Sequence, residues 1–295
     1  MPETSQGQVR HDIFFHSPQP FAQVAGIGPL SLFPSINPLY SLSGLFVGML
    51  VGLTGVGGGS LMTPLLVLLF GVHPSTAVGT DLLYAALTKT AGTAVHGMHG
   101  RVNWKITGLL ACGSVPAALL MLWVMAGVNR ESEAVANTIT LSLGVLLLLT
   151  AAMLVLRRHI VAFARKWRGE RHVVRPHTIA VITVMLGLAL GTLVTLTSVG
   201  AGALGVTVLL VLYPQLDVRE IVGSDIVHAV PLTLIGGMGY WMIGEIDWVM
   251  LVALLIGSIP GIVIGSLIAP RLHERVIRLV LAATLVIVAW KLLAG

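Results

Sequence analysis

The chain has 295 residues, of which 56% are hydrophobic and 10% are charged. A soluble protein averages about 25% charged residues, so this chain has too few polar groups to cover a soluble surface. Its net charge of +5 lies mostly between apolar segments, which excludes a nucleic-acid-binding protein and is typical of a polytopic membrane protein. The single cysteine, Cys112, excludes an internal disulfide and a cysteine-based zinc cluster.

Ten apolar helices are predicted after an N-terminal extension over residues 1–39. A helix needs about 20 residues to span a bilayer, so three of the ten are too short to span alone. These three flank two glycine-rich breaks, at residues 57–59 and 200–202. The predicted helices cover residues 41–55, 60–70, 75–96, 104–126, 134–156, 177–197, 203–213, 218–242, 248–269 and 276–293.

The second half of the chain matches the first as an internal duplication. The two repeats cover residues 40–157 and 177–295, and a cationic loop over residues 158–176 joins them. The matching residues include glycines, acids, tryptophans and prolines in the same order, which a shared apolar composition would not produce. The pairs are Gly44 with Gly187, Gly48 with Gly191, Thr54 with Thr197, Gly57 with Gly200, Gly59 with Gly202, Asp81 with Asp225, Trp104 with Trp248, and Pro116 with Pro260.

The glycine breaks leave two topologies open. Helices that run straight through the breaks make the repeats parallel, whereas hairpins give each repeat an odd number of crossings and make the repeats inverted. With residues 157–175 in the cytoplasm, hairpins place six further Lys and Arg residues inside and three outside, and straight helices place four and five. Because cytoplasmic loops are enriched in these residues, the count favours hairpins.

The predicted fold class is therefore an all-α polytopic membrane protein with two homologous, inverted repeats, each with a glycine-broken helical hairpin and three spanning helices. Loops 71–74 and 244–247 are expected on the side opposite the cytoplasmic 157–175 stretch. Inverted repeats with broken helices are common in secondary transporters, whose substrate sites lie where the breaks meet.

Four motifs carry a family resemblance: GVGGG at residues 55–59, PLL at 64–66, AVGT at 77–80 and GRVNW at 100–104. Together they closely resemble the TauE/SafE family of sulfite exporters, from about residue 41 to the C-terminus. The resemblance implies a multi-pass carrier in the bacterial inner membrane that exports sulfite, organosulfonates or related small anions. It also implies a small polar residue after the Gly-Thr pair, where this chain has Asp81 and, in the second repeat, Asp225.

The glycine breaks are the predicted substrate site. Free N–H groups at a helix start attract anions, and the helix dipole adds to this. The alternative is that these glycines only permit close helix packing, as those at 44, 48 and 52 are expected to do. The predicted substrate-binding residues are Thr54, Gly57, Gly58, Gly59, Ser60, Thr63, Thr80, Lys89, Thr197, Ser198, Gly200, Gly202 and Ser224.

Ionisable residues inside spanning segments are expensive and are candidates for function. Asp81, Asp225 and His228 are predicted to couple transport to protons or sodium ions. The alternative is that the two acids are helix-start groups satisfied by the backbone and by the Thr80 and Ser224 hydroxyls. Lys89 lies deeper and is predicted to recruit the anion.

Three function classes remain open at this point. The leading interpretation is an exporter of a small sulfur anion that works by alternating access with no cofactor, its partners being the anion, the bilayer and a coupling ion. A passive anion channel and a membrane-embedded enzyme built on the Asp and His residues are the alternatives. The sequence leaves a homodimer open and indicates no metal site and no nucleic-acid partner.

Overall fold

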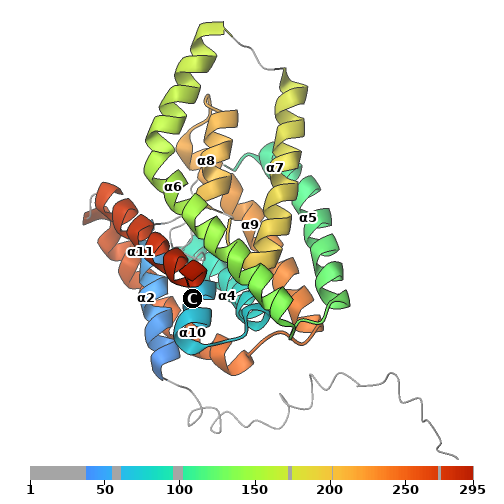
Figure 1. Ribbon diagram of the computed structural model, residues 1–295. Helices are drawn as coiled ribbons and strands as arrows, with labels where there is room; N and C mark the ends of the chain where they lie inside the picture. Colours follow the sequence, from blue (N-terminus) through green and yellow to red (C-terminus); the bar gives the residue numbers. More distant parts are fainter. Residues whose placement is uncertain are drawn as a thin grey trace, which may run out of the picture. The chain divides into compact units, whose positions relative to one another are not determined.

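The computed structural model describes residues 38–54, 61–95, 102–171, 175–200, 202–271 and 274–294, all within one structural unit that begins at Ile36. All regular structure in these residues is helical (Figure 1). Most of the predicted extension and the break residues 57–60 lie outside the described part. The helices are α2 (Pro38–Thr54), α3 (Met62–Phe70), α4 (Pro74–Val95), α5 (Trp104–Gly127), α6 (Glu133–Arg171), α7 (Pro176–Thr197), α8 (Ala203–Leu212), α9 (Val218–Met242), α10 (Trp248–Ile268), a 3₁₀ helix (Ala269–Arg271) and α11 (Glu274–Ala294).

Six of the described helices are long and apolar enough to cross a membrane, as judged by length and composition: α5, α6 up to Arg157, α7, α9, α10 and α11. Helix α4, which the sequence predicts to span, has 22 residues but is not among them, because Asp81, Lys89 and several threonines make it more polar. Its residues 77–86 are all buried. Since other helices cover α4, it needs no apolar surface of its own toward lipid.

Large apolar side chains cover the outside of the helices. Trp123 on α5, Leu148 on α6, Ile259 on α10 and Ile287 on α11 are all exposed. Soluble proteins rarely present such wide apolar surfaces, whereas a lipid bilayer solvates them. The described helices therefore have the surface of a multi-pass membrane protein.

Helix α6 differs from the prediction at its C-terminal end. It has 39 residues and continues to Arg171, so most of the 158–176 stretch is a helical extension rather than a loop. This stretch has no proline before Pro176 and contains Arg, Lys and Ala, which favour helices. The apolar pattern of α6 ends at Arg157, where the cationic turns begin.

The chain reverses direction between α2 and α3, and again between α7 and α8. In the first repeat, the Tyr40 ring at the start of α2 lies 4.5 Å from the Phe70 ring at the end of α3, centroid to centroid. In the second repeat, the Thr183 hydroxyl near the start of α7 lies 2.8 Å from the Tyr213 hydroxyl just after α8. The two contacts join equivalent positions of the duplication. The pairs α2–α3 and α7–α8 are therefore antiparallel hairpins, not straight helices.

The packing repeats in the same way. Helix α2 packs on α10 and α7 packs on α5, while α4 pairs with α9 and α6 pairs with α11. A Cβ atom on Gly48 would collide with the backbone of Ser258, and one on Gly191 would collide with the backbone of Ser114. These are again equivalent positions, and only glycine permits such close helix contact. The prediction that the Gly48 stripe serves packing is confirmed.

Candidate functional site

The Asp81 carboxylate caps the N-terminus of α3. Its Oδ2 atom accepts a hydrogen bond from the Thr63 backbone N–H at 3.1 Å and a second one from the Thr63 hydroxyl at 2.5 Å. Both residues are fully buried. The first N–H groups of a helix have no partner within the helix, and the helix dipole favours a negative charge there. The α3 donors that the sequence assigns to the substrate are thus held by a carboxylate of the protein itself.

Ser198 brings the second glycine break to the same carboxylate. It follows α7 in a left-handed conformation, with φ of 59°, and interacts with Asp81. Its hydroxyl and the Asp81 Oδ1 atom are buried, and despite this interaction neither atom makes a hydrogen bond of normal geometry within the described residues. Unpaired buried polar atoms typically cost about 1–3 kcal/mol each. Their presence marks a polar spot with unused hydrogen-bonding capacity between the two repeats.

The second repeat has a similar arrangement with different chemistry. A Cβ atom on Gly205 would lie 2.5 Å from the Asp225 Oδ1 atom, so this carboxylate lies against the first turn of α8. Val206 stands at the position equivalent to Thr63 and offers no hydroxyl. Asp225 Oδ1 has no hydrogen-bond partner in the described part of the chain.

Lys89 lies within electrostatic range of both carboxylates. It interacts with Asp225 and with Asp81, and His228 in turn interacts with Lys89. Among the described residues, Lys89 makes no direct salt bridge with either acid, and its side chain is partly exposed. The structure therefore gathers three of the predicted ionisable residues around a single lysine.

His228 also has a structural partner. Its Nε2 atom lies 2.7 Å from the Ser114 hydroxyl, which links α9 to α5. At the equivalent positions, the Tyr84 hydroxyl donates to Ser258 at 2.8 Å and links α4 to α10. Because both repeats make this contact, the His228–Ser114 bond serves helix packing, while the His228 Nδ1 atom has no partner among the described residues.

Thr80 and Ser224 bond to loop residues rather than to the neighbouring aspartates. The Thr80 hydroxyl accepts from the Asp247 N–H at 3.2 Å, and the Ser224 hydroxyl accepts from the Asn103 N–H at 2.8 Å. These contacts are also equivalent in the two repeats. The sequence left open that the Thr80 hydroxyl bonds to Asp81. The structure shows the Thr63 hydroxyl in that role instead.

The remaining predicted break residues shape the backbone. The Thr197 hydroxyl donates to the Leu193 carbonyl at 2.7 Å and accepts from the Val199 N–H at 3.2 Å, which stabilises the end of α7. Gly200 and Gly202 have φ angles of 122° and 115°, which residues other than glycine rarely adopt. Four predicted site residues lie outside the described part of the chain: Gly57, Gly58, Gly59 and Ser60. The side chain of Thr54 also lies outside it.

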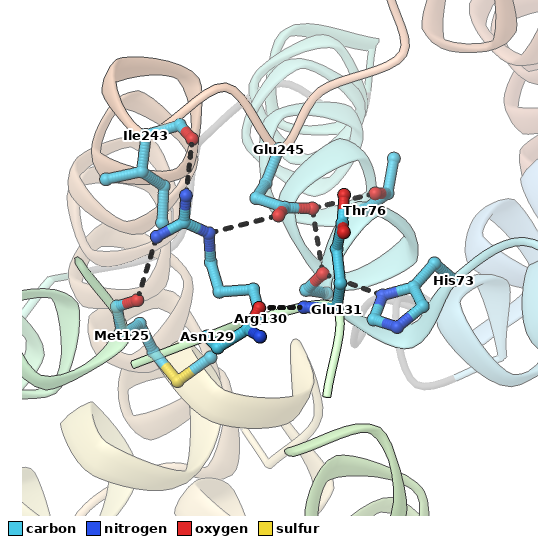
Figure 2. Close-up of polar contacts among 9 residues, drawn as sticks. His73, Thr76, Met125, Asn129, Arg130, Glu131, Ile243 and Glu245 are labelled. Carbon is cyan, nitrogen blue, oxygen red and sulfur yellow. Dashed lines mark hydrogen bonds and ion pairs between the residues drawn. The ribbon is translucent and has the colours of Figure 1, made fainter. Parts of the chain in front are cut away.

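One polar network was not predicted from the sequence. Arg130 Nε lies 3.1 Å from Glu245 Oε1, and the guanidinium also donates to the carbonyls of Met125 and Ile243 (Figure 2). The Ser75 and Thr76 hydroxyls both donate to Glu245 Oε2 at 2.8 Å. We call this network the Arg130–Glu245 latch. It ties the start of α4 to the loops after α5 and α9. One indication of it was present in the sequence, because these three segments were expected on the same side of the membrane.

The apolar helices define a multi-pass membrane protein, and its buried charged residues lie beside the two short helices α3 and α8. The profile of the family described as "Sulfite exporter TauE/SafE" matches residues 40–292. The chain therefore belongs to the TauE/SafE sulfite exporter family, and the resemblance noted in its motifs is confirmed.

Several curated relatives carry the name "Probable membrane transporter protein". YjnA of Bacillus subtilis is 38% identical over 253 residues, which cover 85% of this chain and 98% of the relative. YdhB of the same organism is 29% identical over 75% of this chain and 85% of its own length. MJ0441 of Methanocaldococcus jannaschii is 27% identical over 81% of this chain and 90% of its own. No solved structure matches the chain. The family and these names indicate a membrane transporter rather than an enzyme.

Proposed function

We propose that the protein is a secondary transporter that exports sulfite, an organosulfonate or a related small anion across the bacterial inner membrane by alternating access. The observation that carries this proposal is the buried cluster of Asp81, Thr63 and Ser198 at the start of α3, with Lys89 in electrostatic range of Asp81. Charged groups at membrane depth are costly and mark substrate or ion pathways. The family to which the chain belongs supports a small sulfur oxyanion as the cargo.

The donors in this cluster suit an oxyanion. Thr63 offers an N–H and a hydroxyl, Ser198 offers a hydroxyl, and Lys89 offers an ammonium group. The start of α3 adds the positive end of the helix dipole. Sulfite and sulfonates carry three oxygen atoms on one sulfur, so they can accept hydrogen bonds from several of these donors at once.

The duplicated architecture supports alternating access. Both repeats fold back at their breaks, and the packing of α2 on α10 recurs as the packing of α7 on α5. We infer that the repeats have opposite orientations in the membrane, because two inverted copies can exchange conformations and open one site to each side in turn.

Counterflow in proteoliposomes tests this function. Vesicles that hold the full chain and unlabelled sulfite should accumulate labelled sulfite transiently, because a carrier exchanges one anion for another. Sulfate, sulfonates and unrelated carboxylates added outside then rank the substrates by competition. Sulfur oxyanions are expected to compete and unrelated carboxylates are not.

The same experiment separates the alternatives. A passive anion channel would let labelled sulfite equilibrate but would give no transient accumulation. Accumulation that carboxylates suppress as well as sulfite does would contradict the sulfur-anion substrate while leaving a carrier in place. Empty vesicles are the control for leakage.

A further inference from the structure

The Asp81 carboxylate already occupies an anion-binding position. Its Oδ2 atom uses both the N–H and the hydroxyl of Thr63 at the start of α3. These are the donors that the proposed function assigns to the substrate. A carboxylate and a sulfur oxyanion cannot use the same donors at the same time, so Asp81 must release Thr63 before a substrate can bind there.

The fixed charges around Asp81 add up to an anionic cluster. Lys89 on the same helix and Asp225 on α9 are the charged groups that interact within it, and Thr63 on α3 and Ser198 after α7 contribute neutral hydroxyls. With both carboxylates ionised and the ammonium protonated, the net charge of the cluster is −1. An incoming anion would make the charge more negative in a low-dielectric interior, where like charges repel strongly. Binding therefore requires a positive charge to enter with the anion.

Two further titratable groups face the cluster and add no fixed charge to it. Tyr84 interacts with Asp81, and its hydroxyl is bonded to Ser258. His228 interacts with Lys89, and its Nε2 atom lies beside the Ser114 hydroxyl. The Tyr84 phenol is neutral, and a proton on the His228 Nδ1 atom, which is unpaired within the described residues, would place a second positive charge near Lys89, which is unfavourable. The carboxylates are therefore the groups that take up a proton when an anion binds.

A proton on Asp81 removes both obstacles at once. It neutralises one negative charge and weakens the bonds that hold Thr63. The new carboxyl O–H can donate to the Ser198 hydroxyl oxygen, which lies beside Asp81 and has no partner among the described residues. The Asp81 Oδ1 atom is also unpaired there, so it is the atom on which we place the proton.

We propose that Asp81 fills the substrate position at the start of α3 and leaves it by taking up a proton, so that each anion is carried together with one proton. This inference rests on the proposed anion transport. Asp225 is not held in this way, because Val206 stands in place of Thr63 in the second repeat and provides no hydroxyl. A monovalent sulfonate would then cross without net charge, and a divalent anion would carry one net negative charge.

The test uses the full chain in proteoliposomes with an internal pH dye, and methanesulfonate and sulfite as probes. Methanesulfonate is permanently ionised, so any proton that moves with it reports on the protein. Asp81→Asn keeps the size and one acceptor oxygen but cannot ionise. The matched control is Asp247→Asn, because Asp247 caps α10 and the equivalent residue of the first repeat, Asn103, already caps α5 in the same way.

Wild type and Asp247→Asn should move one proton with each anion. For both, the half-saturating concentration of the anion should rise about tenfold per pH unit at alkaline pH. Asp81→Asn should exchange anions without proton flux and without this pH dependence. For sulfite, whose own protonation is common to all variants, the difference between the variants is the readout. Thr63→Val gives an independent test, because loss of a bond to the ionised carboxylate should shift the pH profile toward higher pH.

Each contrary result has its own meaning. If wild type exchanges neither probe, the proposed function fails. If wild type exchanges anions without proton flux, the function stands and proton coupling through Asp81 is wrong. Proton coupling that survives in Asp81→Asn but disappears in Asp225→Asn would assign the proton to the second repeat and overturn the inference. If Asp81→Asn does not insert, an unshifted pH profile for Thr63→Val contradicts it.

Discussion

The two repeats share their packing but differ in their polar chemistry. Tyr84–Ser258 and His228–Ser114 are equivalent contacts, as are the glycine contacts of α2 with α10 and of α7 with α5. At the helix breaks the correspondence ends. The duplicated contacts hold the helices together, and the proposed binding residues lie where the repeats differ.

The differences are concentrated around one carboxylate. Asp81 has Thr63 as its donor, whereas Asp225 faces the turn that holds Val206. Lys89 in the first repeat corresponds to Thr233, whose hydroxyl only bonds carbonyls of its own helix. A duplicated fold can thus keep equivalent packing contacts while the polar residues of its two copies differ.

The largest expected effect is on the shared packing. Gly48→Leu should prevent stable folding or lower the free energy of unfolding by about 1–3 kcal/mol or more, because the side chain would meet the Ser258 backbone. Gly191→Leu should do the same in the other repeat. Gly108→Leu on α5 is the matched control, since nothing lies within 4 Å of its Cβ position. Thermal unfolding in detergent measures all three. Equal effects of Gly48→Leu and Gly108→Leu would contradict the packing role.

The next effect concerns the charge that only the first repeat has. Lys89→Met should raise the half-saturating anion concentration about ten- to hundredfold, since a hydrogen bond to a charged group contributes about 1.5–3 kcal/mol. Lys89→Arg should have a smaller effect because the charge remains. Thr233→Val, at the equivalent position of α9, is the control and should leave the concentration nearly unchanged. Transport assays that find Lys89→Met unimpaired would remove Lys89 from the binding site.

The Arg130–Glu245 latch should have a smaller effect on stability. The side chains are 25% and 15% exposed, so water screens the ion pair and its coupling energy should be about 1 kcal/mol. A double-mutant cycle with Arg130→Gln and Glu245→Gln measures this coupling by thermal unfolding. The double variant should be only slightly less stable than either single variant. Additive losses would show that the two side chains act independently.

The smallest expected effect concerns the first turns of the short helices α3 and α8, where one repeat has Thr63 and the other has Val206. Thr63→Val makes the first repeat resemble the second and should weaken anion binding a few-fold. The lost bond to the anion is worth about 1.5–3 kcal/mol, but the substitution also removes a bond of the competing Asp81 carboxylate, which offsets part of the loss. Val206→Thr makes the opposite change and is the matched control, because no substrate is assigned to that turn. An equal effect of both substitutions on the half-saturating concentration would mean that the repeats bind the anion together.

Much of the fold could be predicted from the sequence. Except at the C-terminal end of α6, predicted and observed helix ends differ by no more than three residues, because glycines, prolines and the limits of apolar runs mark them clearly. The hairpins followed from counting basic residues on each side. Helix α6 ran past its predicted end because charge, unlike proline or glycine, does not stop a helix.

The site was only partly predictable. Asp81, Asp225, His228 and Lys89 were identifiable because ionisable residues are rare in apolar helices. Their partners were not, because the Thr63–Asp81 contact spans 18 residues and depends on how α3 folds against α4. The Arg130–Glu245 contact spans 115 residues, and no local pattern connects its two loops.

The most direct test of the binding site is a crystal structure with selenite, a heavier relative of sulfite whose selenium gives an anomalous signal. We expect a peak at the start of α3, within hydrogen-bond distance of the Thr63 N–H and the Ser198 hydroxyl, with the Asp81 carboxylate moved away from Thr63. A peak only at the start of α8, or a Thr63–Asp81 bond that persists beside bound selenite, would contradict a substrate site built on the first repeat.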